Sequence, residues 1–151
     1  MSDFNEKLGS FLADLGEGRK MVLSTAENGK VSSRMMSVVC FGGKLWFQTD
    51  KNLRKYRQLT ANKFVSLCID NIQIEGICEE FGHPLENGQF CEAFKKCFKV
   101  SFDAYTSLKN ERLFCVEPVF IERWIYIEGV PYIETFDLKN KQHKLEKYIS
   151  E

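Results

Sequence analysis

Residues 32–55 read SSRMMSVVCFGGKLWFQTDKNLRK, and this stretch decides the fold. Two mostly apolar runs, 31–41 and 44–49, stand on either side of Gly42-Gly43. Paired glycines between two such runs indicate the tight turn of a β-hairpin. A basic block follows at once and opens a short helical pattern. The stretch therefore predicts strand, turn, strand and helix in that order.

The charged residues of this stretch suggest an anion site. Arg34 lies inside the first apolar run, where its charge must find a partner or reach water. Lys51, Arg54, Lys55 and Arg57 follow the second run. A hydroxyl at a strand end, the amides of a helix N-terminus and several cations together suit a phosphate. Basic residues on a short helix are also common as a solvated face, so the residues alone leave both interpretations open.

Three motifs, taken in order, resemble a known family. They are R-M-M-S on the first strand, F-Q-T at the end of the next, and L-R-K-Y-R-Q-L-T-A-N-K-F-V-S-L-C after it. Together they resemble the pyridoxamine 5'-phosphate oxidase-like family of FMN-binding split barrels. The resemblance covers residues 19–81 well and residues 117–136 more weakly.

The resemblance implies a set of FMN-binding residues. Arg34 and Lys55 would hold the phosphate, with Arg54 and Thr49 assisting. One departure is Leu53, which stands where relatives carry a serine, so a hydroxyl donor is lost that Lys51 is placed to replace. The other residues would surround the flavin ring: Met35, Met36 and Ser37 along it, Phe47 and Gln48 as one wall, Gln73 beside it, and Trp124 reaching it from the opposite subunit. Without the resemblance, Gln73 would be an exposed strand amide and Trp124 a core residue.

Composition points to one globular domain over residues 1–151. The chain is 44% hydrophobic, contains 13 Phe, and balances 21 basic against 21 acidic side chains. This balance gives no support to nucleic-acid binding or to a membrane-surface role. The N-terminus lacks the pattern of a signal peptide, and no apolar stretch is long enough to span a membrane. A cytoplasmic protein is expected.

The cysteines predict neither a disulfide framework nor a metal site. There are six of them, with no CxxC pair and only two His in the chain. Free, buried thiols are the better interpretation, and no metal site is expected.

Periodicity and turn signals predict a mainly β (α+β) fold with six or seven antiparallel strands, arranged as a barrel or a sandwich with peripheral helices. The resemblance implies the first of these, a six- to seven-stranded antiparallel split β-barrel. Besides the hairpin, Asp50 or Asn52 is placed to cap a helix that reaches about Thr60. Residues 101–113 suggest a loop with helical turns, and residues 139–151 a weak helix. The remaining expected elements are helices over 3–16 and 87–99, and strands over 21–26, 64–70, 72–81, 114–128 and 132–138, with Asn28-Gly29 as a second hairpin turn.

The sequence offers no catalytic residues that can be assigned. It contains no G-x-S-x-G elbow, no Walker loop and no Rossmann glycine pattern, and both His fall in a loop or the charged tail. Flavin chemistry lacks nothing obvious, because the cofactor brings the reactivity and the protein supplies binding and electrostatics. The substrate pocket would be built by loops such as 81–86 and 101–113.

Within the family, the chain looks like the short members, which include 5-nitroimidazole reductase-like and general-stress flavoproteins. It lacks the R-L-H-D-R-type ending of true pyridoxamine 5'-phosphate oxidases. The resemblance implies a homodimer with FMN sites at the interface. It also implies an oxidoreductase that reduces a small nitroaromatic- or quinone-like acceptor with electrons from NAD(P)H. The alternatives are a non-catalytic flavin carrier or stress sensor, and the same fold with F420 or haem.

Overall fold

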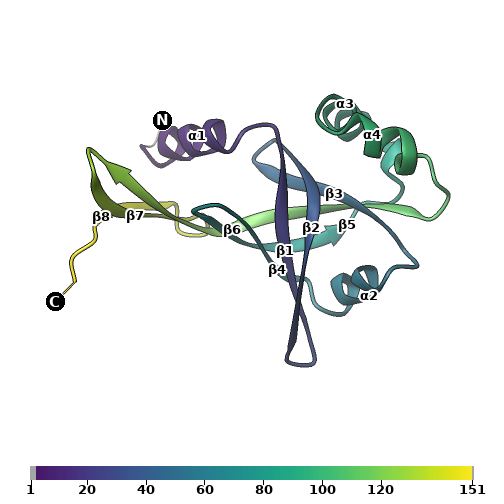
Figure 1. The fold of residues 1–151 in the computed structure, drawn as a ribbon, viewed down its shortest axis with the longest axis horizontal. Helices are drawn as coiled ribbons and strands as arrows, with labels where there is room; N and C mark the ends of the chain where they lie inside the picture. The colour runs from purple at the N-terminus through teal and green to yellow at the C-terminus, as the bar shows by residue number, and fades with distance from the viewer. Residues whose placement is uncertain (1–2, 151) are drawn as a thin grey trace.

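Eight antiparallel strands make up most of the structure, a computed structural model that describes residues 3–150 (Figure 1). The helices are α1 (Asp3–Leu15), α2 (Arg54–Ala61), α3 (Gly88–Cys97) and α4 (Lys99–Ser101), with a 3-10 turn η1 (Pro84–Glu86) and a π-helical turn η2 (Phe102–Thr106). The strands are β1 (Gly18–Glu27), β2 (Lys30–Phe41), β3 (Lys44–Asp50), β4 (Phe64–Ile69), β5 (Ile72–Glu80), β6 (Glu111–Ile127), β7 (Val130–Asp137) and β8 (Gln142–Lys147).

Six of the strands close into a barrel. The sheet order is β3-β2-β1-β4-β5-β6-β7-β8, and an additional pairing of β3 with β6 closes the first six into a ring. Strands β7 and β8 continue the sheet beyond β6 and extend away from the barrel (Figure 1). The predicted split barrel is confirmed, with six strands in the barrel and two outside it.

Both predicted hairpin turns are present. Asn28 and Gly29 have φ of 52° and 77°, and Gly42 and Gly43 have φ of 62° and 74°. Two successive residues in the left-handed region suit the twist of antiparallel strands, and glycine and asparagine enter that region readily.

Strand β3 is buried on both faces because it separates two apolar clusters. Leu45 and Phe47 belong to the barrel core, which α1 covers at one end with Phe11 and other residues. Trp46, between them, belongs instead to an outer cluster with Phe90 and other residues, formed where α3 packs on the outside of the barrel. The alternation follows from the strand period of two.

Strand β6 is the longest strand and bends where it changes partners. Its register with β5 shifts between Glu75 and Gly76, which lie opposite Phe120 and Pro118, so that Val119 is left as a bulge. Pro118 fits such a position because it has no N–H to donate to the ladder. The bulge lets the first half of β6 complete the barrel while the second half pairs with β7.

A buried charge network fixes the outer strands to α1. Arg123 on β6 contacts Glu134 on β7 at 2.5 Å and Asp14 on α1 at 3.0 Å. His143 on β8 lies 2.8 Å from the other oxygen of Glu134. The Arg123 guanidinium also lies over the ring of Phe11, 5.1 Å from its centroid. These contacts join α1, near the start of the chain, to three consecutive strands near its end.

Two predictions near the ends of elements are wrong. Residues 142–147 form β8, not part of a helix, because their pairing with β7 and the contact of His143 stabilise a strand that has no apolar alternation. Strand β6 begins at Glu111, before the predicted residue 114, because Glu111 pairs with Asp50 on β3. The predicted helical turns after residue 100 are confirmed as η2.

All six cysteines are free, as predicted, but only two are buried. Cys78 and Cys115 lie in the interior, whereas Cys68 is exposed. Among residues 3–150, no group of three or more His, Cys, Asp or Glu is placed to hold a metal ion. No helix in the described part of the chain is long and apolar enough to cross a membrane.

Replacing Gly76 with alanine should destabilise the fold. A Cβ at this position would lie 2.5 Å from Val116 Cγ1 and 2.8 Å from the Glu117 carbonyl oxygen. Because the backbone oxygen cannot easily move, we expect the free energy of unfolding to fall by about 1–3 kcal/mol. The control is Gly9→Ala, whose Cβ would meet nothing within 4 Å and should raise stability by about 0.4–1 kcal/mol. Urea denaturation measures both, and equal effects would contradict the close approach.

Candidate functional site

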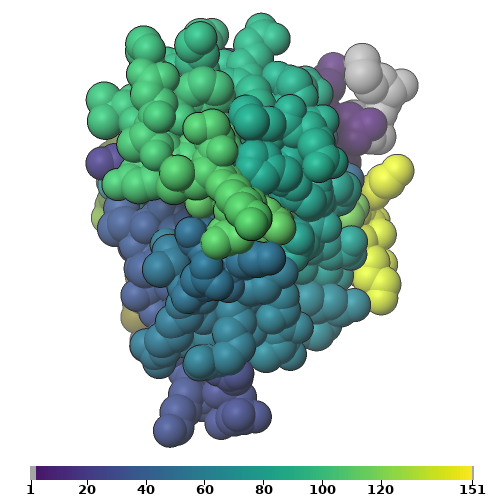
Figure 2. Space-filling model, turned by 90° about the vertical axis from the view of Figure 1, so that its right-hand side faces the viewer, coloured from purple at the N-terminus to yellow at the C-terminus, as the bar shows by residue number. Residues whose placement is uncertain are grey.

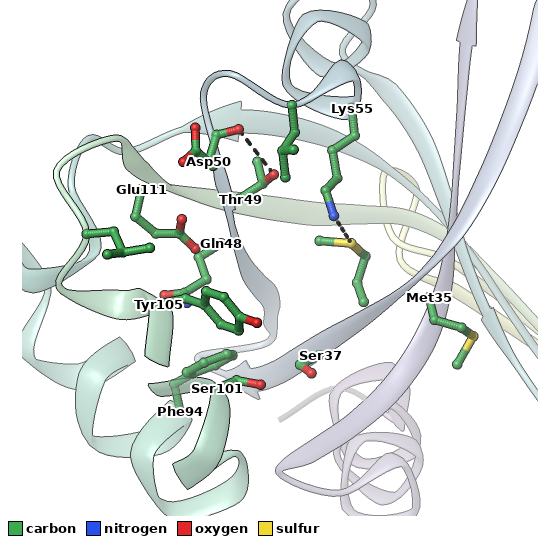
Figure 3. Close-up of a pocket in the computed structure, with 13 residues that line it drawn as sticks. Met35, Ser37, Gln48, Thr49, Asp50, Lys55, Phe94, Ser101, Tyr105 and Glu111 are labelled. Carbon is green, nitrogen blue, oxygen red and sulfur yellow. Dashed lines mark hydrogen bonds between the residues drawn. The ribbon is translucent and has the colours of Figure 1, made fainter. Parts of the chain in front are cut away.

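A cavity of about 440 Å³ opens at the rim of the barrel, beside β2 and β3 (Figure 3). On this face of the molecule α2, in blue, lies below the green segment that contains α3, α4 and η2 (Figure 2). Half of the twelve residues predicted to bind FMN line the cavity: Met35, Met36, Ser37, Gln48, Thr49 and Lys55. The other six lie outside the lining: Arg34, Phe47, Lys51, Arg54, Gln73 and Trp124.

One wall of the cavity comes from the segment between β5 and β6. Phe94, Ser101 and Tyr105 project toward β2 and β3 in Figure 3. The buried hydroxyl of Thr106 donates to Gln48 Oε1 at 3.0 Å and thereby fixes η2 to β3. Of the two loops expected to build a substrate pocket, residues 101–113 contribute to the lining of this cavity and residues 81–86 do not.

Lys55 enters one end of the cavity, and two further cations, Arg34 and Arg54, lie close to it outside the lining. Lys55 reaches in from α2, and its Nζ lies 3.5 Å from the sulfur of Met36 (Figure 3). Burial, followed by repulsion from Arg34, lowers the pKa of Lys55, and the carboxyl of Glu111 partly offsets this. Burial, followed by repulsion from Arg54, lowers the pKa of Arg34. Among residues 3–150, none of the three cations forms a salt bridge, so their charge is available to a bound anion.

Neutral groups hold Arg34 in place. Its guanidinium donates to the Thr25 hydroxyl at 3.0 Å and to the Leu23 carbonyl at 3.2 Å, and it contacts the side-chain oxygen of Gln58 on α2. The guanidinium of Arg34 therefore has hydrogen-bond partners, which an arginine in an apolar strand needs, but none of these partners is negatively charged. The side chain ties α2 to the β1–β2 hairpin.

The N-terminus of α2 has no side-chain cap. The N-cap residue is Leu53, with φ −85° and ψ 153°, and no side-chain hydrogen bond is made there. The prediction that Asp50 or Asn52 caps this helix is wrong, because Asp50 Oδ1 instead accepts from the backbone N–H of Asn52 at 2.7 Å. The backbone amides at the start of α2 therefore receive no side-chain acceptor, and they lie next to Lys55. This arrangement suits an anion.

A buried carboxyl faces the cations. Glu111 is only 5% exposed, lines the cavity, and pairs across the ladder with Asp50. Burial, and then the neighbouring Asp50, raises the pKa of Glu111 to about 7, while Lys55 opposes the shift. Glu111 is not among the residues predicted from the sequence. The only feature that could have pointed to it is the position of an acidic residue shortly before the apolar run LFCV.

Four of the residues predicted to bind FMN lie away from the cavity of their own chain. Phe47 is in the barrel core, where its ring stacks on Phe114 at 5.7 Å. Lys51 and Gln73 are exposed, on the loop after β3 and on β5. Trp124 is 36% exposed and contacts Tyr126 and Tyr148 near the β7–β8 end, so it is not a core residue.

The family model of pyridoxamine 5'-phosphate oxidase matches residues 6–124. The search of curated proteins found no significant match.

Several solved structures share the fold. PhzG from Burkholderia lata, in complex with tetrahydrophenazine-1-carboxylic acid, has a TM-score of 0.66 at 18% identity, over 99% of this chain and 94% of that one. A pyridoxamine 5'-phosphate oxidase-related, FMN-binding protein from Nostoc punctiforme has a TM-score of 0.64 at 13% identity, over 99% of each chain. A NimC/NimA family protein from Clostridium acetobutylicum has a TM-score of 0.58 at 14% identity, over 94% of each chain.

The structural neighbours differ in what they bind. They also include General Stress Protein 26 from Bacillus anthracis, an F420 reductase, and HutZ, the haem storage protein of Vibrio cholerae, at 21, 18 and 14% identity. At these identities the likeness shows the fold alone. It agrees with the predicted similarity to nitroimidazole reductase-like and general-stress proteins.

Serine at position 53 should give a more stable protein than alanine at the same position. A serine hydroxyl at the N-cap can accept from an amide of the first turn of α2, which leucine cannot. Leu53→Ala is the matched control, because both variants lose the same half-exposed apolar side chain. We expect Leu53→Ser to exceed Leu53→Ala in free energy of unfolding by about 1 kcal/mol. Equal stabilities in urea denaturation would show that the helix start is already satisfied by water.

Proposed function

Because the chain belongs to the pyridoxamine 5'-phosphate oxidase family, we propose that it binds one FMN per chain, non-covalently, in the cavity beside Lys55. We further propose that it is an oxidoreductase, which reduces a small nitroaromatic- or quinone-like acceptor with electrons from NAD(P)H. The observation that carries the proposal is the group of three cations at the cavity end, none of which forms a salt bridge in the described part of the chain.

The residues present fit FMN. Lys55 supplies a compact charge, and the uncapped start of α2 offers amides to phosphate oxygens. Thr49 supplies a hydroxyl on the same side of the cavity. The β2 residues Met35 and Ser37 present strand backbone and small or flexible side chains to a flat ring system. When bound, FMN would supply the redox chemistry.

Arg34 has a positioning role in this proposal. Its guanidinium is already bound by neutral acceptors on β1 and α2, so it holds the helix start against the hairpin. Its positive charge still acts on the cavity end, because none of those acceptors neutralises it.

We also propose a homodimer in which the second half of β6 reaches the site of the partner. The support is a group of exposed aromatic and aliphatic side chains at that end of the molecule, which a stable contact would bury. This group consists of Trp124, Tyr126, Ile127, Leu145, Tyr148 and Ile149.

A flavin carrier without turnover is the second candidate, since no catalytic side chain is assigned. Haem gains no support from the histidines and cysteines, although Met35, Met36 and Tyr105, whose residue types also ligate haem, do line the cavity. His83 bonds to the Leu108 carbonyl and accepts from the Leu85 amide, His143 bonds to Glu134, and neither His nor any of the six cysteines lines the cavity.

Phosphate recognition predicts a strong preference for FMN over riboflavin. Lys55→Met should weaken FMN binding by about 1.5–3 kcal/mol, because a hydrogen bond to a charged group is lost, and should leave riboflavin binding almost unchanged. The control is Lys63→Met, which removes an exposed lysine that does not line the cavity. Fluorescence titration of the three apoproteins with each flavin measures all six affinities. Equal binding of the two flavins by the unmodified chain would refute the phosphate site.

Turnover separates the enzyme from the carrier. We expect NADH or NADPH to bleach the flavin band of the FMN complex in stopped-flow mixing, and an added nitroaromatic or quinone to restore it. Trp124→Ala should change the reduction rate while costing less stability than the roughly 3–5 kcal/mol of a buried tryptophan, since its side chain is exposed in one chain. A flavin band that stays intact with both donors would leave the carrier as the function.

A further inference from the structure

We propose that Glu111 couples cofactor binding to proton uptake: when the phosphate of FMN enters the cavity, the carboxylate of Glu111 takes up one proton. The proton comes from solvent or buffer, an O–H bond forms on the carboxyl, and no other bond changes. The inference rests on the proposed function, because it requires FMN to bind in the cavity. It makes the affinity for the cofactor depend on pH near neutrality.

The Glu111 side chain borders the cavity and is otherwise enclosed by the protein. The side chain is almost fully buried, and among residues 3–150 no group donates a hydrogen bond to its carboxylate or forms a salt bridge with it. Asp50 lies directly opposite it in the β3–β6 ladder, and like charges in that position destabilise each other. In Figure 3, Glu111 and Lys55 enter the cavity from different elements, with Thr49 between them.

The groups that face Glu111 determine its charge. They are Asp50 on β3, Lys55 on α2 and, among the cavity-lining side chains of η2, the neutral Tyr105. The neighbouring Arg112 points elsewhere, with its guanidinium bound to the backbone carbonyl oxygens of Lys109 and Glu111 and 3.8 Å from Glu80. Lys55 is therefore the one described cation that favours the ionised carboxylate.

A bound phosphate changes that balance in one direction. It neutralises Lys55 and adds negative charge to a cavity that already holds two carboxyl groups, so the charged form of Glu111 is disfavoured. In the free chain burial raises the pKa of Glu111 to about 7, so this carboxyl is mostly ionised at pH 8. Binding raises the pKa further. Cofactor affinity should therefore fall as the pH rises above about 7, because each binding event must then bring in a proton.

Calorimetry of the apoprotein with FMN at pH 8, in two buffers of different ionisation enthalpy, counts the protons. FMN is already a dianion at that pH, since the second pKa of a phosphate monoester is about 6. We expect the unmodified chain to take up close to one proton more per FMN than Glu111→Gln. We also expect its dissociation constant to rise on the order of tenfold between pH 7 and pH 9, and that of Glu111→Gln to stay nearly flat.

Three comparisons make the test specific. Glu117→Gln, an exposed glutamate on the same strand, should behave as the unmodified chain. Asp50→Asn keeps an oxygen for the Asn52 amide but removes the neighbouring charge, so the fall in affinity should begin at lower pH. Riboflavin should bind without the extra proton. The Asp50→Asn and riboflavin arms decide the matter even if Glu111→Gln folds poorly.

The outcomes separate the inference from the proposed function. FMN binding with the same proton count in Glu111→Gln as in the unmodified chain overturns the role of Glu111 and leaves the FMN site intact. Equal proton uptake with riboflavin overturns its electrostatic basis. A chain that binds neither flavin overturns the proposed function itself, and the coupling with it.

Discussion

The pairing of β3 with β6 is the interaction on which the rest of the structure depends. It closes six strands into a barrel and so removes two exposed sheet edges, which would otherwise invite association with other chains. It also brings residues 48–50 of the first hairpin beside residues 111–113, from a part of the chain some sixty residues later. The cavity lies along this seam, and the carboxyl groups of Asp50 and Glu111 meet only because the barrel closes.

The cations at the cavity end show how a protein can keep positive charge available. A partly buried guanidinium needs partners for its N–H groups, yet a carboxylate partner would cancel its charge. Arg34 is satisfied by a carbonyl, a hydroxyl and an amide oxygen, so its hydrogen bonds are made while its charge persists. Its repulsion of Lys55 is a cost of the free chain that an anion would relieve, so part of the binding energy of a phosphate is stored in the fold.

Local chemistry made the early hairpins predictable, whereas the resemblance was needed to predict a barrel and long-range contacts could not be predicted at all. The hairpins at Asn28-Gly29 and Gly42-Gly43 could be predicted because each depends on residues adjacent in sequence. Strand β8 could not, because its sequence is polar except for Leu145 and it is held by pairing with β7 and by His143. Half of the predicted FMN residues line the cavity, and all six of these lie on β2, β3 or the first turn of α2. Glu111 and Tyr105 enter through tertiary structure, which no local pattern reports.

Strand β3 contributes to two parts of the cavity. This strand carries Thr49 beside the cations, and its Gln48 receives the buried hydrogen bond from Thr106 that fixes the opposite wall. That wall includes a π-helical turn, a backbone form that is costly and found mostly at functional sites. Loss of the Thr106 bond would leave Gln48 without a partner in a buried position, so the turn cannot move freely from the strand. Strand β3 therefore joins the part of the cavity beside Lys55 to the wall that carries Tyr105, through one buried hydrogen bond.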